Sequence, residues 1–209
     1  MFEFPRFGTG DPRHAVALVR ENPFALVVSA VHGPPVATHA PVLVESAADD
    51  TLVGGTLLGH MARVNPQWRD FVGSPEILLI FSGPHGYVSA SVYQADPAVP
   101  TWNYAAVHVT GTVELITDPD GTLDVVEQTV ATVESTRPQP WQPSARSRER
   151  FVSLLSGVTA FRVRVTRQHS LFKLSQDGDG DRRRRVREEF RTGPHPNAAL
   201  AELMERVDP

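Results

Sequence analysis

A ten-residue segment that begins at Gly59 brings together side chains able to hold a cofactor with an acidic tail. It contains the imidazole of His60, the guanidinium of Arg63 and an Asn-Pro pair at Asn65. Asparagine before proline predicts the start of a short helix, Pro66 to Phe71, whose free N–H groups would bind an anion. The histidine could bind a metal while the arginine and the helix start hold a phosphate or a propionate. Taken alone, the segment is more typical of a structured turn with a hydrogen-bonded histidine.

A second group of such side chains lies on one predicted strand. Trp102, Tyr104 and His108 share a face that could stack on a planar ring and hydrogen-bond to its edges. For this segment alone, a core aromatic cluster is the simpler interpretation. A third group, Lys173 and Ser175, pairs an ammonium with a hydroxyl, as phosphate and carboxylate sites do. Lys173 is also the only lysine among 20 basic residues, which indicates either a need for a compact ammonium or chance retention.

The composition excludes or disfavours several classes of function. The chain has 209 residues and no cysteine, so disulfides, thiolate-ligated haem, cysteine-held iron–sulfur clusters and a cysteine nucleophile are excluded. A net charge of −4 argues against a nucleic-acid partner, and acids flank the basic run 182–185 as in a solvated helix. No apolar run is long enough for a membrane span, and the first residues do not resemble a signal peptide. We therefore expect no membrane partner and a cytoplasmic location.

The elements that must position these groups are mostly short, closely spaced strands. Strands are predicted at 24–31, 36–44, 51–58, 76–82, 87–93, 101–116, 158–167 and 171–175. Helices are predicted at 11–21, 118–134, 148–155, 182–191 and 197–207, with a turn at 32–35. The predominance of strands in the first 116 residues favours a mainly β antiparallel barrel with peripheral helices. Closure into a barrel would also remove exposed sheet edges.

In combination, the three segments resemble the PaiB family of FMN-binding negative transcriptional regulators. The resemblance rests on residues 59–68, on Pro100 to Tyr104 with His108, and on Lys173-Leu174-Ser175-Gln176, in this order. It implies a flavin-binding split barrel that forms a homodimer with cofactor sites at the subunit interface. On this basis the chain divides into a split-barrel domain, 1–176, and a charged helical extension, 177–209.

Two departures from the usual PaiB pattern make the chain more similar to the piperazate synthases of this group. Ser89 to Tyr93 has Ala90 and Val92 where relatives commonly have proline and tryptophan, which would open room near the cofactor. Asp177 follows Gln176 where relatives commonly have asparagine. This similarity implies haem b, a small amino-acid substrate, and conversion of N5-hydroxy-L-ornithine to L-piperazic acid through a new N–N bond.

By the same resemblance, His60 is the expected axial iron ligand, with His108 and His39 as the alternatives. Arg63 and Lys173 are expected to bind cofactor propionates or the substrate carboxylate, and with His60 they form the expected catalytic set. The other residues expected to contact the cofactor are Asn65, Gln67, Trp68, Trp102, Asn103, Tyr104, His108, Ser175 and Gln176.

An FMN-binding flavoprotein is the alternative function. In that case Arg63, the helix after Asn65 and Lys173 would hold the FMN phosphate, and His60 would donate a hydrogen bond. A DNA-binding repressor follows from the family's name alone, because the sequence contains no helix-turn-helix pattern and no basic face.

Overall fold

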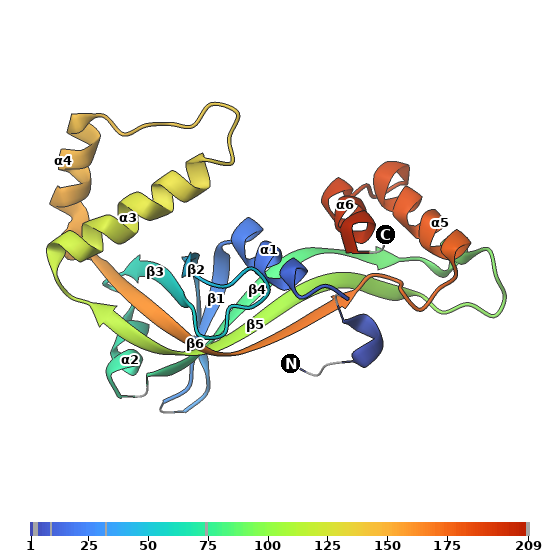
Figure 1. The fold of residues 1–209 in the computed structure, drawn as a ribbon, viewed down its shortest axis with the longest axis horizontal. Coiled ribbons are helices and arrows are strands. Elements are labelled where there is room, and N and C mark those ends of the chain that lie inside the picture. The colour runs from blue at the N-terminus through green and yellow to red at the C-terminus, as the bar shows by residue number, and fades with distance from the viewer. Residues whose placement is uncertain (2–3, 9, 32, 74, 208–209) are drawn as a thin grey trace.

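Six antiparallel strands close into a barrel in the computed structural model, which describes residues 1, 4–8, 10–31, 33–73 and 75–207 (Figure 1). The strands follow one another around the barrel in the order β1-β2-β3-β6-β5-β4. They are β1 (Phe24–Ser29), β2 (Val36–Ser46), β3 (Thr56–Ala62), β4 (Glu76–Val88), β5 (Thr101–Ile116) and β6 (Val158–Lys173). The expected mainly β antiparallel barrel is confirmed. The turn predicted at 32–35 includes His32, which lies outside the described residues.

Helices surround the barrel and its extended strands. The α-helices are α1 (Arg13–Glu21), α2 (Asp70–Gly73), α3 (Pro119–Glu134), α4 (Ala145–Leu154), α5 (Gly180–Thr192) and α6 (Ala198–Val207). Short 3-10 helices are η1 (Pro5–Phe7), η2 (Pro66–Arg69), η3 (Ala90–Tyr93) and η4 (Leu155–Gly157). Among the described residues, none of these helices has the length and apolar character needed to cross a bilayer.

The best-predicted elements are β5 and α3, which follow each other in the chain. Both have the bounds that the sequence indicated, because β5 alternates cleanly between buried and partly exposed residues. Asp118 then begins α3, since its side chain accepts a hydrogen bond of 2.6 Å from the backbone N–H of Gly121. Asn65 begins η2 in the same way, as expected, by accepting a 3.0 Å hydrogen bond from the N–H of Gln67.

Two predicted breaks between strands are wrong. Residues 76–82 and 87–93 were expected to form two strands, but β4 continues through Gly83 and Pro84, and its register against β5 shifts between Ser82 and His85. This irregularity accommodates the proline without ending the strand. Residues 90–93 form η3 instead of a strand end. The turn expected near residue 168 is also absent, because β6 stays paired with β5 from Arg167 to Lys173.

The third strand begins later than expected and contains His60. Gly54, at φ +83°, belongs to a turn, so β3 starts at Thr56 and not at Thr51. Gly59 therefore lies within the strand, where a Cβ would come within 2.5 Å of the Phe161 ring in the barrel core. At this glycine the Phe161 ring packs closely against the backbone, which continues as a strand without a bend.

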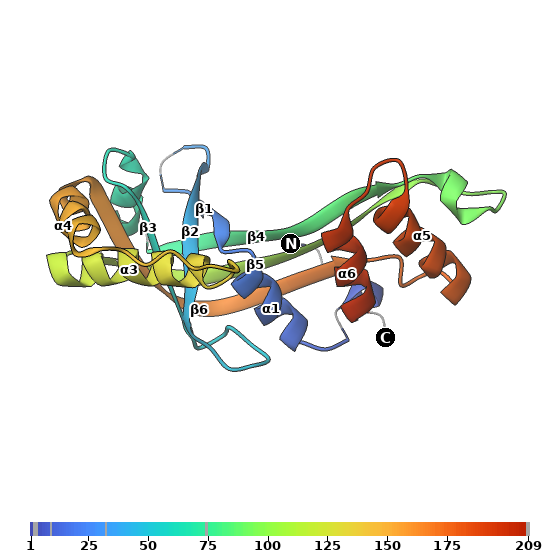
Figure 2. The same cartoon turned by 90° about the horizontal axis from the view of Figure 1, so that it is seen from above.

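Three strands extend beyond the barrel and give the molecule its length. In both views β4, β5 and β6 run from the barrel toward α5 and α6, which lie against their far part (Figures 1 and 2). Val186 and Phe190 of α5 and Leu200 of α6 are buried in the same core as the barrel residues. The division of the chain at residue 176 stays a prediction, but the helices after it pack directly on the strands.

Candidate functional site

The three sequence segments fall into two groups at opposite ends of the chain's long axis. His60 on β3 is paired with Ala160 near the start of β6, and Lys173 is the last residue of β6. Thirteen residues at about 3.3 Å each separate Ala160 and Lys173 by roughly 40 Å along the strand. We refer to residues 60–69 as the β3–η2 corner and to the cavity beside Lys173 as the strand-end pocket. In Figure 1 α2, which directly follows the corner in the chain, and α5, which contributes Arg182 to the pocket, lie far apart along the long axis.

At the corner, His60 is half-buried beneath α3. Its Nδ1 lies 3.5 Å from the Oγ of Thr129, which itself donates to the Val125 carbonyl at 2.8 Å. Because that hydrogen is already used, the Thr129 oxygen can only accept from the imidazole, which favours a proton on Nδ1 and a lone pair on Nε2. Burial also lowers the pKa of His60 below its ordinary value. A neutral imidazole with a free nitrogen is suited to bind a metal or to accept a hydrogen bond.

Two arginines flank one tryptophan at the same corner. The guanidinium carbons of Arg63 and Arg69 each lie 5.2 Å from the centre of the Trp68 ring. The indole N–H also donates to the Arg63 carbonyl at 3.0 Å, which fixes the ring. Neither arginine has an ion pair with a carboxylate among the residues that the structure describes. The corner therefore presents positive charge that an acidic ligand could neutralise.

The amide side chains of the corner hold the backbone in place. Asn65 donates to the Thr38 hydroxyl at 2.8 Å in addition to beginning η2. Gln67 is only 2% exposed, and its amide NH2 donates to the carbonyls of Val27 and Val36 and to the Ser29 hydroxyl. In this structure both residues position the corner, and only the buried Oε1 of Gln67 lacks a hydrogen-bond partner among the described residues.

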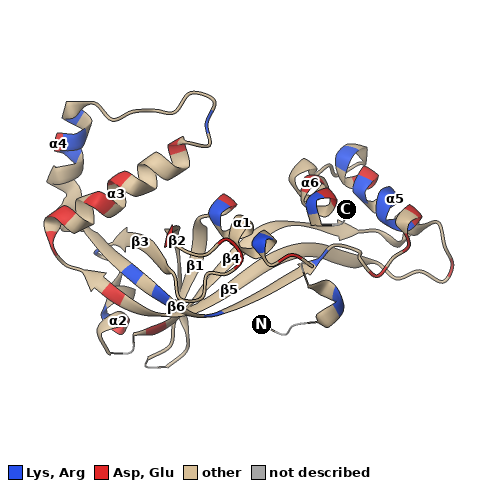
Figure 3. Ribbon diagram, in the orientation of Figure 1, with Lys and Arg blue, Asp and Glu red and all other residues tan. Residues whose placement is uncertain are grey.

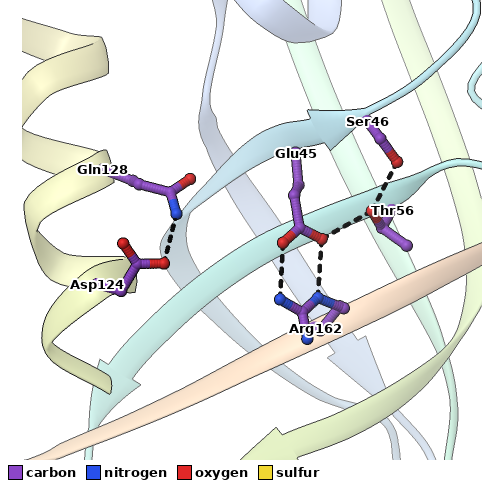
Figure 4. Close-up of polar contacts among 6 residues, drawn as sticks. All are labelled: Glu45, Ser46, Thr56, Asp124, Gln128 and Arg162. Carbon is purple, nitrogen blue, oxygen red and sulfur yellow. Dashed lines mark hydrogen bonds and ion pairs between the residues drawn. The ribbon is translucent and has the colours of Figure 1, made fainter. Parts of the chain in front are cut away.

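An ion pair supports the barrel wall beneath α3. Arg162 of β6 donates two hydrogen bonds, of 2.7 and 2.8 Å, to the carboxylate of Glu45 on β2, and Thr56 of β3 donates a third (Figure 4). The hydrogen bonds from Arg162 lower the pKa of Glu45. These contacts join the three strands that border the corner, so they hold β3 and His60 in position.

The strand-end pocket is a cavity of about 410 Å³ between η1, η3, the ends of β5 and β6, and α5. Several of its lining residues belong to the second and third sequence segments, namely Thr101, Asn103, Tyr104, Lys173 and Ser175. Tyr104 and Lys173 are direct partners across β5 and β6. The sheet thus brings together the second and third sequence segments, which are about seventy residues apart in the chain.

Lys173 points its ammonium into this pocket region. It donates to the hydroxyl of Thr101 and lies 5.8 Å from the centre of the Phe7 ring. Like Arg63, it forms no ion pair with a carboxylate among the described residues. An ammonium carries three N–H groups, so two remain for a ligand.

The other polar residues of the third segment are engaged internally. Asn103 is fully buried. Its Nδ2 donates to the Ser175 hydroxyl at 3.0 Å, and the same hydroxyl donates to its Oδ1 at 3.1 Å. These contacts hold Ser175 at φ +67°, a conformation that non-glycine residues seldom adopt. Gln176 accepts from the N–H of Leu174 at 2.7 Å and donates to the Phe172 carbonyl. These side chains shape the end of β6.

The remaining candidate residues lie outside both groups. Trp102 is 52% exposed and lies 5.9 Å from His85 and 6.1 Å from Tyr87, ring centre to ring centre. His108 is opposite His169 and lines another cavity, of about 590 Å³. Burial lowers the pKa of His108 most, and the positive charges of the N-terminal amine and of His169 lower it further. His39 is exposed and stacks on Phe24 at 5.6 Å. No group of three or more His, Asp or Glu able to hold a bare metal ion occurs among the described residues.

Three residues that sequence reasoning missed contribute to these sites. Thr129 orients His60 from α3, while Tyr93 and Arg182 line the strand-end pocket from η3 and α5. Tyr93 was assigned to a strand end, and Arg182 to a solvated helix. The sequence contained no periodic signal for these contacts, because each depends on how a helix packs against distant strands.

Comparison with known proteins agrees with this architecture. Residues 1–167 match the family model described as "Putative FMN-binding domain". The chain is 35% identical over 188 residues to the Protease synthase and sporulation protein PAI 2 of Bacillus subtilis (strain 168), covering 90% of this chain and 88% of the relative. It is 28% identical over 202 residues to the uncharacterized protein AN0679 of Emericella nidulans, covering 79% and 80% of the two chains.

Solved structures share the fold at low sequence identity. The flavocytochrome Anf3 from Azotobacter vinelandii matches with a TM-score of 0.56 at 16% identity, covering 78% of this chain and 67% of that chain. The FAD and heme binding protein from Mycobacterium smegmatis matches with a TM-score of 0.55 at 18% identity, covering 79% and 73%. The resemblance drawn from the three sequence segments is confirmed: the chain belongs to the PaiB-like family of FMN-binding-domain split barrels.

Proposed function

We propose that this protein is a haem-dependent piperazate synthase, which forms the N–N bond of L-piperazic acid from N5-hydroxy-L-ornithine. The observation that carries the proposal is that Asp177, where relatives commonly have asparagine, lines the strand-end pocket together with Lys173. The other departure lies close in the chain to this pocket: Ala90 and Val92 belong to η3, whose last residue, Tyr93, lines the pocket, while Val92 lines a neighbouring cavity. The chain therefore adds a carboxylate where a substrate could bind.

The corner fits a haem b. His60 supplies a neutral imidazole whose Nε2 is available, and this is the nitrogen that an axial ligand needs. Arg63 and Arg69, without carboxylate partners among the described residues, would bind the propionates beside Trp68. Two proteins that share the fold are named for haem, the flavocytochrome of Azotobacter vinelandii and the FAD and heme binding protein of Mycobacterium smegmatis.

The strand-end pocket fits a small amino acid. Lys173 would bind the substrate carboxylate, and Asp177 the α-ammonium until it loses its proton. The α-amine then attacks the hydroxylamine nitrogen, the N–O bond breaks, and the hydroxyl leaves as water, so that the overall reaction consumes no oxidant or reductant. When bound, the haem iron would supply Lewis-acid activation of the hydroxylamine. Positioning of the two nitrogens supplies the rest of the rate enhancement.

The separation of the two groups requires a second subunit. Within one chain the corner and the pocket are roughly 40 Å apart along β6, too far for one small substrate to contact both. A homodimer in which the corner of one subunit faces the pocket of its partner would form a complete site. The family resemblance implies a homodimer with cofactor sites at the subunit interface, which is compatible with this arrangement.

The proposal is tested by incubating purified protein with N5-hydroxy-L-ornithine and separating the products by chromatography with mass detection. We expect a product that has lost one water and that co-elutes with authentic L-piperazic acid. Absence of this product from haem-loaded, dimeric protein would contradict the proposal.

FMN binding without this reaction is the second candidate function, and the family match favours it. In that case Arg63 and the start of η2, together with Lys173 supplied by a second subunit, would hold the FMN phosphate, and His60 would lie beside the flavin as a hydrogen-bonding group and not as a metal ligand. The same purified protein distinguishes the two candidates, because a flavoprotein would release FMN on denaturation.

A further inference from the structure

Uncompensated positive charge surrounds the strand-end pocket. Lys173, Arg182 and Arg6 all line it, and none of the three forms an ion pair with a carboxylate among the described residues. Each lies over an aromatic ring instead: Arg6 and Lys173 over Phe7 at 5.0 and 5.8 Å, and Arg182 over Tyr93 at 3.7 Å. In a chain of net charge −4, this concentration of unpaired cations indicates an anionic ligand.

Two hydrogen-bond donors beside the same cavity lack an acceptor. Tyr93 is only 2% exposed, and its hydroxyl has no hydrogen-bond partner among the residues that the structure describes. The Nε of Arg182, whose guanidinium lies over the Tyr93 ring, is also buried and finds no partner in the same described part of the chain. Such groups are costly in a folded protein unless a ligand satisfies them.

The Thr101 hydroxyl is a third donor that its contact with Lys173 leaves available. The Thr101 oxygen accepts a hydrogen bond from the Lys173 ammonium, so the hydroxyl hydrogen of Thr101 is free to point elsewhere. The pocket thus combines donors from β5, β6, η3 and α5, and most of its charged lining residues are cations. Asp177 is the one carboxylate among the residues that line it.

We propose that the strand-end pocket binds the oxyanion head, a carboxylate or a phosphate, of a small organic ligand, and that Tyr93, Thr101 and Arg182 bind it together with Lys173. The inference deepens the proposed function, and rests on it only for the choice of ligands: the carboxylate would belong to the amino-acid substrate and the phosphate to FMN. It also gives α5 a direct role in binding.

Calorimetric titration of the purified full-length protein tests the inference with matched probes. L-ornithine is compared with putrescine, which lacks the carboxylate, and FMN is compared with riboflavin, which lacks the phosphate; inorganic phosphate is the third arm. Binding of ornithine but not putrescine identifies a carboxylate site. Binding of phosphate, and of FMN more tightly than riboflavin, identifies a phosphate site.

Two substitutions then place the binding in this pocket. Tyr93→Phe and Arg182→Gln should each weaken the binding of the responsive probe by about tenfold, because each removes a hydrogen bond to a charged group. Arg184→Gln is the matched control on α5, since Arg184 is exposed and pairs with Asp181 at 2.7 Å, and it should bind like the wild type. Tyr93→Phe should also keep its thermal stability, because the hydroxyl that it removes has no partner in the protein.

The inference is overturned if no oxyanion probe binds, if putrescine and riboflavin bind as tightly as their counterparts, or if both substitutions leave binding unchanged. These outcomes are separable from the fate of the proposed function. Oxyanion binding without piperazate formation would keep the pocket and reject the synthase. Piperazate formation that is insensitive to Tyr93→Phe and Arg182→Gln would do the reverse.

Discussion

The β3–η2 corner and the strand-end pocket are built alike but offer different chemistry. Each contains a cation that lies over an aromatic ring and has no carboxylate partner within the described part of the chain, Arg63 on Trp68 and Lys173 near Phe7. In each, a buried amide holds its surroundings in place: Gln67 donates to the Val27 carbonyl and Asn103 to the Ser175 hydroxyl. The corner adds a half-buried neutral histidine and remains open, with Val64 91% exposed, whereas the pocket is a bounded cavity without a histidine.

This difference indicates a division of roles. An open surface with an imidazole and two arginines suits a large planar cofactor that a second subunit would cover. A bounded cavity with several donors suits a small polar ligand. The charge distribution agrees, since basic residues occur near both ends of the long axis while α5 also carries acidic residues (Figure 3).

Removal of the histidine should separate the two regions most strongly. His60→Ala should weaken haem binding by more than about a hundredfold, because even a lost partner of an iron ligand costs about ten- to a hundredfold. The ratio of Soret to protein absorbance after purification measures the effect. His39→Ala is the control, since His39 is exposed and stacks only on Phe24. Unchanged haem content in His60→Ala would transfer the axial role to His108.

Substitutions of the asparagine amides in the two regions should change the stability of the protein by different amounts and leave ligand affinity unchanged. Asn103→Ala should lower the free energy of unfolding by about 2 kcal/mol, because it leaves the buried Ser175 hydroxyl without its partner. Asn65→Ala should cost about 1 kcal/mol, the usual loss for a helix-start residue. Urea denaturation measures both. A larger loss for Asn65→Ala would show that the corner is the more tightly built region.

Exchange of the single lysine should affect the pocket alone. Lys173→Arg should raise the KM for the amino-acid substrate by about tenfold, because the planar guanidinium cannot keep the ammonium's contact with Thr101 and reach the ligand in the same geometry. Haem content should not change. Full activity of the variant would show that the site has no need for a lysine at this position. Loss of haem would show that Lys173 binds the cofactor and not the substrate.

The smallest effect concerns pH. Burial lowers the pKa of His60 below 6.5, so below that pH the unfolded chain gains a proton that the folded chain resists. The stability of the cofactor-free protein should therefore decrease as the pH falls below 6.5, until it reaches the lowered folded-state pKa. His60→Gln should remove the contribution of this imidazole and so flatten the pH dependence of the free energy of unfolding over the interval. An identical slope in thermal melts of the variant would contradict the neutral state assigned to the imidazole.

Local signals in the sequence were sufficient for much of the fold. The alternation in β5 and the Asp118-Pro119 start of α3 predicted both elements within their observed bounds. The breaks expected in β4 and β6 were wrong because strand pairing overrides local turn signals at Gly83-Pro84 and near Gln168. Propensity is a weak prior where a neighbouring strand, here β5, supplies hydrogen bonds.

The candidate site was predictable only in part. The motifs identified Lys173 and the residues of β5 that follow Thr101. The register between β5 and β6 places Lys173 directly opposite Tyr104. The motifs did not predict that the side-chain NH2 groups of Gln67 and Gln176 would donate to backbone carbonyls, which for Gln67 lie far away in the chain. The separation of the corner from the pocket could not be predicted either, because it follows from the unbroken length of β6.

The visible absorption spectrum of the purified protein tests the central claim most directly. We predict a Soret band that shifts or disappears in His60→Ala and persists in His39→Ala, as expected for a haem held by the β3–η2 corner. Twin flavin bands in a protein that contains no iron would contradict the claim and leave the FMN-binding alternative.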